Sequence, residues 1–141
     1  MQLIISLTFY LFIQTNSTDT TLVFREINYS EVFEIARKEN KPVFLYFHFI
    51  GCSGCLKMEQ TVFVNKEIQD FLNHNFICYS VNISKPDGIE TNKIYRAWDF
   101  PSFLFLDPDG NIIYRFVGIR SSEEFIMEAN KAFDLFSDNP N

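Results

Sequence analysis

The chain has 141 residues, of which 47% are hydrophobic and 17% aromatic, and its formal net charge is −6. This composition fits one compact domain with a well-filled core and excludes a disordered or repetitive chain. Because the chain is acidic and carries no basic stripe, we expect no nucleic acid partner.

The first 18 residues differ in composition from the rest. Residues 3–13 form an apolar stretch broken only by two hydroxyl side chains, and no charged residue precedes Asp19. A membrane span needs about 20 apolar residues, so this stretch is too short for one, but it has the length of the apolar region of a signal peptide. No basic residue precedes it and no clear cleavage site follows it. We expect residues 1–18 to be a signal peptide and residues 19–141 to form the domain, with a buried N-terminal strand or an uncleaved anchor as alternatives.

Apolar periodicity and capping residues predict alternating strands and helices after this segment. Residues 22–25 are a candidate first strand, and Ser30 is a candidate cap for the helix that follows. Residues 43–49 are apolar except for His48 and show no alternation, which indicates a strand buried on both faces. The further predicted elements are helices over 55–64, after the cap Asn65 and over 90–98, strands over 76–82, 102–106 and 111–117, and a last helix whose capping box is Ser121 with Glu124.

The predicted order places parallel crossovers first and a hairpin near the end. The hairpin turn is Asp107-Pro108-Asp109-Gly110, with Pro and Gly where turn geometry favours them. This order predicts a single α/β domain with a central mixed sheet flanked by helices. Tyr95 and Trp98 are expected to pack in its core.

Two cysteines, Cys52 and Cys55, follow the apolar strand and Gly51. Thiols three residues apart at the start of a helix lie on one turn, close enough to pair. The first lies where unpaired helix N–H groups and the positive end of the dipole favour a thiolate. Because a thiolate attacks disulfides and a thiol scarcely does, the motif predicts a redox-active dithiol.

Two other interpretations of this pair stay open. A purely structural disulfide would close a very short loop and add little stability. A zinc site needs four ligands, and the other candidates, His48, His74 and Cys78, do not repeat a ligand spacing, so we expect no metal. Cys78 lies in an apolar strand-like run, where a buried, unreactive thiol is expected.

The order of elements, with a CxxC motif after the second predicted strand, resembles thioredoxin. It resembles more closely the small thioredoxin-like proteins of bacterial envelopes. The resemblance spans about residues 22–136 and depends on two separate motifs in the expected order. The first comprises Lys41-Pro42, Cys52-Ser53-Gly54-Cys55, Lys57-Met58-Glu59, Val62-Phe63, Asn65-Lys66-Glu67-Ile68 and Asn75-Phe76, and the second runs from Phe100-Pro101-Ser102 through the hairpin turn to Gly118.

The resemblance implies a thioredoxin-like fold and roles for the matching residues. Cys52 would attack a substrate disulfide, and Cys55, which is more shielded, would resolve the mixed disulfide. Pro101 would form a cis peptide bond with Phe100, lie against the dithiol and leave backbone exposed for a substrate strand. The substrate groove would be open at Gly51, where many relatives have Trp, and narrowed by the bulky Phe100.

One departure concerns the proton of the second cysteine. Tyr46, six residues before Cys52, occupies the position of the buried acid of thioredoxin, so another group or water must deprotonate Cys55. His48 is expected to point into the same region, either as a packed supporting residue or as a proton-transfer group. Glu59 is expected to be an exposed helix residue that could tune the local field.

These observations predict a protein-disulfide oxidoreductase that is periplasmic or secreted. Its partners would be proteins with disulfides or thiols and a second redox protein that recycles the dithiol. No flavin, nicotinamide or metal motif is present, and we expect no bound cofactor and a monomer. The reductase direction is favoured, although the sequence does not fix it. The alternatives are a non-catalytic thioredoxin-like binding module and a redox sensor or chaperone-like holdase.

Overall fold

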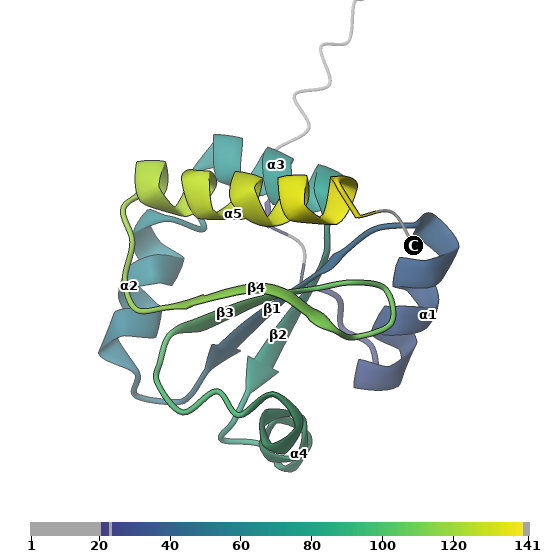
Figure 1. Ribbon diagram of the computed structural model, residues 1–141. Helices are drawn as coiled ribbons and strands as arrows, with labels where there is room; N and C mark the ends of the chain where they lie inside the picture. Colours follow the sequence, from purple (N-terminus) through teal and green to yellow (C-terminus); the bar gives the residue numbers. More distant parts are fainter. Residues whose placement is uncertain (1–20, 23, 140–141) are drawn as a thin grey trace, which may run out of the picture.

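The computed structural model describes residues 21–22 and 24–139, and the predicted signal peptide lies outside them. Among the described residues, no helix is long and apolar enough to cross a membrane. The elements of the described part are shown in Figure 1. In chain order they are α1 (Tyr29–Glu39), β1 (Val43–His48), α2 (Ser53–Thr61), α3 (Lys66–Asn75), β2 (Ile77–Asn82), α4 (Pro86–Tyr95), β3 (Ser102–Leu106), β4 (Ile112–Val117) and α5 (Ser122–Ser137).

The sheet has the strand order β2-β1-β3-β4. Strand β1 runs parallel to β2 and antiparallel to β3, and β3 and β4 form the antiparallel hairpin predicted from the turn at residues 107–110. The sheet is therefore mixed, and the predicted α/β fold is confirmed. In this topology β1 is a central strand, and its carboxyl end leads directly to the two cysteines.

Helices cover both faces of the sheet, which explains why β1 is apolar without alternation. The face that carries Phe44 and Tyr46 packs against α2, α3 and α5. The opposite face, which carries Val43 and Leu45, packs against α1 and α4. In Figure 1, α3 and α5 lie together above the sheet and α4 lies below it.

The face beneath α2 and α5 is filled with aromatic rings. Phe44 stacks on Phe105 with ring centroids 5.1 Å apart, and Phe103 lies 4.7 Å from Phe116. Phe125 of α5 meets these rings edge-on. Burying one such side chain contributes about 1.5–3 kcal/mol. The high phenylalanine content therefore belongs to a packed core next to the cysteine-bearing helix.

Several predicted boundaries differ from the structure. The described residues of the candidate first strand, 22 and 24–25, form no strand, although the Arg25 N–H donates to the Cys78 carbonyl oxygen at 2.8 Å. Helix α1 begins at Tyr29 rather than after Ser30. The Asn65 cap and the Ser121 capping box are confirmed. At both correctly predicted caps, a side-chain oxygen accepts backbone N–H groups of the first helical turn. Helix α1 has no such side-chain hydrogen bond to mark its start.

Helix α4 begins and ends earlier in the chain than predicted, so that Trp98 lies outside the helix and outside the core. Proline fits the first helical position because no N–H is needed there. The helix ends at Tyr95, and Arg96 adopts a left-handed conformation with φ 53°. Trp98 therefore lies beyond the helix and is 69% exposed, whereas Tyr95 is buried as predicted.

Gly88 in α4 predicts a measurable effect on stability. A Cβ built there would lie 2.0 Å from the carbonyl oxygen of Asn82, which is backbone and cannot rotate away. Gly88→Ala is expected to lower the free energy of unfolding by about 1–3 kcal/mol in urea denaturation. Glu90→Ala, at an exposed position of the same helix, is the control and should stay within about 0.5 kcal/mol. An unchanged midpoint for Gly88→Ala would contradict the close packing of α4 against β2.

Candidate active site

The dithiol lies where β1 gives way to α2. Gly51 makes the connection with φ 92°, a left-handed conformation that favours glycine, and a Cβ there would meet nothing within 4 Å. The sulfurs of Cys52 and Cys55 are bonded to each other, and the two Cα atoms are 5.2 Å apart. The pairing that the spacing allowed is therefore present, beside an open turn.

The two cysteines have different surroundings. Cys52 is the N-cap of α2, and its Sγ accepts the backbone N–H of Cys55 at 3.1 Å. Cys52 is 8% exposed and Cys55 is 2% exposed. An N–H group and the positive end of the helix dipole both stabilise negative charge on the Cys52 sulfur once the bond is reduced. These features favour Cys52 as the attacking sulfur and Cys55 as the shielded one.

The turn before β3 packs against the residue between the cysteines. The Phe100–Pro101 peptide bond is cis, as predicted. A Cβ built on Gly54 would lie 3.2 Å from Cδ of Pro101, which places the proline ring against the motif. Phe100 is half-buried, and its ring meets the ring of Phe49 edge-on with centroids 5.3 Å apart. The two rings form one wall beside the site.

A third segment, the connection from β4 to α5, completes the site. The Gly118 N–H donates to the Pro101 carbonyl oxygen at 2.9 Å. The side chain of Ile119 lies 3.5 Å from the position of a Cβ on Gly54 and remains exposed. Ile50 and Leu56, on either side of the cysteines in the sequence, are exposed as well. The disulfide therefore lies among exposed aliphatic side chains.

Beneath the dithiol, Tyr46 contacts a carboxylate that the sequence did not place there. The buried Tyr46 hydroxyl donates to Oε1 of Glu59 at 2.9 Å. Burial raises the pKa of Tyr46 above its usual value, and the bond to Glu59 raises it further, so the phenol stays neutral. Glu59 follows Cys55 by four residues, and residues at this spacing are neighbours on one helix face. A carboxylate thus occupies the region where the resemblance to thioredoxin leads one to expect a buried acid.

His48 lies next to this pair. Its ring stacks on Tyr46 with centroids 5.0 Å apart, and its Nε2 lies 2.8 Å from the Ser80 hydroxyl. Burial lowers the pKa of His48, Lys85 lowers it further, and Glu59 opposes the shift. The ring is therefore neutral at pH 7, and its contacts are those of a packed supporting residue.

The comparison with family models agrees with this geometry. Residues 29–133 match the model described as the thioredoxin-like domain. The chain belongs to this family.

Known relatives of the thioredoxin-like domain include solved structures and a longer animal protein. A thioredoxin from Thermus thermophilus is 29% identical with a TM-score of 0.68, covering 77% of this chain and 85% of that one. A putative disulphide-isomerase from Bacteroides thetaiotaomicron is 25% identical with a TM-score of 0.71, covering 82% and 96%. Mouse spermatogenesis-associated protein 20 is 42% identical over 68 residues, which are 48% of this chain. The match spans only 8% of that mouse protein.

The third cysteine of the thioredoxin-like domain is separate from the motif. Cys78 is buried in β2, and its Sγ lies 3.7 Å from the carbonyl oxygen of Leu72. Burial raises the pKa of Cys78 to about 12, and Arg25 and Lys41 lower it only in part. Within residues 21–22 and 24–139, no group of three or more histidine, cysteine or acidic side chains could hold a metal ion.

Cys78 is expected to be unreactive in the folded protein. At pH 8 a thiol with a pKa of about 12 is ionised in about one molecule in 10,000, and the thiolate is the reactive form. After reduction, iodoacetamide should label Cys52 of the native chain quickly, the shielded Cys55 slowly, and Cys78 only in urea. Mass spectrometry of the labelled peptides measures this directly. Rapid labelling of Cys78 in the native state would contradict its burial.

Three residues of the site were missed or undervalued by sequence reasoning. Glu59 was expected to be exposed, but it is partly buried and bonded to Tyr46. Ile119 and Arg120 follow Gly118, which belonged to the second motif only as its last residue. Because they directly follow a glycine of the second motif, their place near the dithiol could have been predicted from the sequence.

Proposed function

We propose that this thioredoxin-like domain is a thiol–disulfide oxidoreductase that acts on protein disulfides through Cys52 and Cys55. The observation that carries the proposal is the asymmetric pair at the start of α2. The more exposed Cys52 sulfur accepts a helix N–H, and the buried Cys55 is bonded to it one turn inside. The cis-Pro101 turn next to the motif supports a substrate groove at this place.

In the reductase direction the dithiol transfers two electrons to its substrate. The Cys52 thiolate attacks one sulfur of the substrate disulfide, forms a mixed disulfide and releases the other substrate sulfur as a thiolate that takes up a proton. Cys55 then loses its proton and attacks Sγ of Cys52. The Cys52–Cys55 disulfide forms, and the second substrate sulfur leaves as a thiolate. A second dithiol protein must reduce the pair again before the next cycle.

Glu59 is the group that takes the proton of Cys55 in this scheme. It lies on the same face of α2 one turn beyond Cys55, and Tyr46 donates a hydrogen bond to one of its oxygens. Within residues 21–22 and 24–139, no side chain donates a hydrogen bond to the other oxygen, so it is free to accept a proton. A neutral Tyr46 holds the carboxylate in place without competing for that proton.

The exposed aliphatic residues around the dithiol favour polypeptide substrates. Ile50, Leu56 and Ile119 would contact apolar side chains near a substrate cysteine, and they would gain little from a small hydrophilic disulfide. The open turn at Gly51 leaves room for a chain to approach. The substrate class is therefore a protein with an accessible disulfide.

The place of action is proposed to be outside the cytoplasm. The apolar residues 3–13, followed by a polar segment, support export. N-terminal sequencing of protein recovered from its native host should begin near residue 19. Protein that begins at Met1 in the cytosolic fraction would contradict export while leaving the redox chemistry unaffected.

A redox titration of the Cys52–Cys55 pair tests the function as a whole. We expect a reversible two-electron transition at a potential between about −270 and −120 mV, the range of known thiol–disulfide exchange proteins. Reduction of insulin by the dithiol should accompany it. A pair that never cycles would overturn the proposal and favour the binding module, which the departures at Gly51 and Tyr46 also allow.

A further inference from the structure

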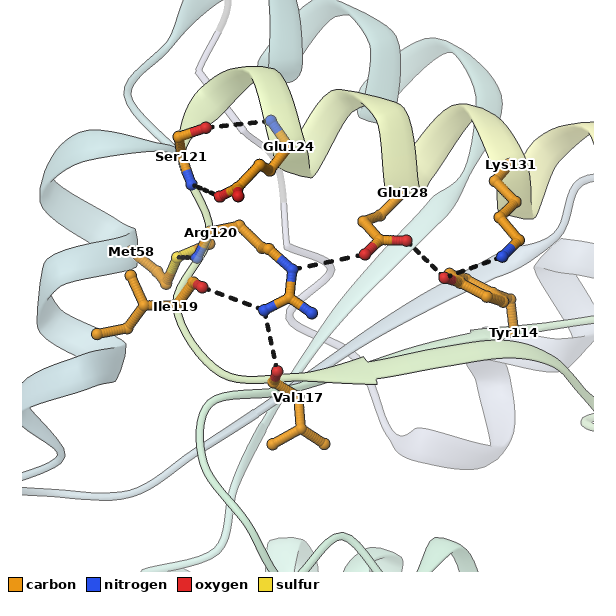
Figure 2. Close-up of polar contacts among 9 residues, drawn as sticks. All are labelled: Met58, Tyr114, Val117, Ile119, Arg120, Ser121, Glu124, Glu128 and Lys131. Carbon is orange, nitrogen blue, oxygen red and sulfur yellow. Dashed lines mark hydrogen bonds and ion pairs between the residues drawn. The ribbon is translucent and has the colours of Figure 1, made fainter.

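Arg120 makes several contacts within the connection between β4 and α5. Arg120 Nη1 donates to the carbonyl oxygens of Val117 and Ile119, at 3.1 Å each. The Arg120 guanidinium lies 5.0 Å from the ring centroid of Phe116. The backbone N–H of Arg120 donates to Sδ of Met58 at 3.3 Å. Figure 2 shows Arg120 turned back over the segment from which it comes. A guanidinium suits this role because its planar set of donors can bond several acceptors at once.

Glu128 of α5 fixes the arginine. Oε1 of Glu128 lies 3.5 Å from Nε of Arg120, and Oε2 accepts the hydroxyl of Tyr114. Nζ of Lys131 lies 4.6 Å from the Tyr114 ring centroid and 3.4 Å from its oxygen, so the network continues along α5 (Figure 2). The side chains of Arg120 and Glu128 are 26% and 24% exposed. Solvent therefore screens this ion pair less than a fully exposed one.

The braced segment is part of the site. Gly118 is hydrogen-bonded to Pro101, and Ile119 packs against the position of Gly54, between the two cysteines. Arg120 bonds the carbonyl oxygens of the residues directly before and after Gly118. The contact with Met58 joins the same segment to α2, one turn after Cys55. The Arg120–Glu128 pair thus fixes one wall of the proposed substrate groove.

We propose that Arg120 and Glu128 are positioning residues that set the shape of the Val117–Ile119 segment for binding a substrate polypeptide. The proposal rests on the proposed function. A protein substrate must lie along this wall before its disulfide reaches Cys52, whereas a small disulfide can reach Cys52 without touching the wall. The pair therefore controls affinity for polypeptide substrates and leaves the chemistry of the dithiol unchanged.

The test compares two substrates across four variants of the full chain. Arg120→Ala, Arg120→Lys and Glu128→Gln are assayed with insulin and with the small disulfide DTNB, and the redox potential of each variant is measured. The control is Arg37→Ala, because Arg37 donates to the Pro108 carbonyl oxygen at 3.2 Å and so contacts a turn away from the dithiol. Urea denaturation of each variant monitors the fold.

We expect Arg120→Ala to raise KM for insulin about three- to tenfold, the factor that corresponds to the net contribution of about one hydrogen bond. Its kcat, its rate with DTNB and its potential should equal those of the wild type. Arg120→Lys should remain impaired, because one ammonium does not reproduce the planar guanidinium. Glu128→Gln should raise KM less, and Arg37→Ala should not change it.

Two results would overturn the proposal. One is an unchanged KM for insulin in folded Arg120→Ala and Glu128→Gln. The other is an equal loss with insulin and DTNB, which would mean that the pair only maintains the fold. A wild-type chain that reduces neither disulfide would instead refute the proposed function, and the positioning role would fall with it. If Arg120→Ala does not fold, Arg120→Lys and Glu128→Gln decide the question.

Discussion

Replacing Cys55 by serine is expected to leave a chain that captures its substrates and cannot release them. Cys52 keeps its place at the start of α2 and still attacks a disulfide, but no second sulfur can resolve the mixed disulfide. With DTNB, the wild-type dithiol should release two thionitrobenzoate ions per chain, the first by Cys52 and the second by Cys55. Cys55→Ser should release one and remain covalently modified, a loss of more than about 100-fold in turnover with insulin.

The matched variants separate the roles of the cysteines. Cys52→Ser should abolish turnover with insulin and react slowly with DTNB, because Cys55 is only 2% exposed. Cys78→Ser should behave as the wild type in both assays, since its thiol is buried outside the motif. In cell-envelope extract, Cys55→Ser should form mixed disulfides that dithiothreitol releases. A faster reaction of Cys55 than of Cys52, or no captured protein with either variant, would contradict the exchange mechanism.

The elements around the dithiol could be predicted because their signals are local. Residues 43–47 are apolar without interruption, Asn65 and Ser121 have the side chains that cap helices, and the turn at 107–110 carries Pro and Gly. The Phe100–Pro101 cis bond followed from the resemblance rather than from any local preference. The fold was therefore accessible from short stretches of sequence that each carry their own physical cause.

The parts that escaped prediction depend on contacts between distant residues. Glu59 lies in a polar-looking stretch of α2, and only the packing of α2 over β1 brings it to Tyr46, 13 residues earlier. Trp98 looked like a core residue because nothing local shows that α4 ends at Tyr95. The pairing of Arg120 with Glu128 across the β4–α5 connection is likewise a product of tertiary structure. Apolar patterns report burial within regular strands and helices, but they do not report where an element ends or which polar groups meet.

Glu59→Gln is expected to slow the attack by Cys55 while leaving the attack by Cys52 unchanged. The amide of glutamine can still accept the Tyr46 hydrogen bond, so the packing of α2 on β1 is kept and only the proton acceptor is lost. General base catalysis contributes about 10²–10⁴-fold to a proton transfer. At pH 7 the second release of thionitrobenzoate from DTNB should therefore slow by about 100-fold, and the first should keep its rate.

The pH profile gives this prediction its sign. In Glu59→Gln, Cys55 must ionise without help, so the second phase should speed up as pH rises. The wild type should depend less on pH, and the difference between the two rates should shrink toward high pH. His48 does not replace the carboxylate, because burial lowers its pKa and its Nε2 is engaged with Ser80.

Two controls identify the carboxylate as the acting group. Glu67→Gln removes an exposed carboxylate from the first turn of α3 and should leave both phases unchanged. Tyr46→Phe removes only the hydroxyl that holds Glu59, so it should slow the second phase less than Glu59→Gln does. If Glu59→Gln follows the wild-type pH profile in both phases, the proton of Cys55 goes to water. The carboxylate beneath the dithiol would then serve only to satisfy the buried Tyr46 hydroxyl, a bond worth about 1.5–3 kcal/mol in stability.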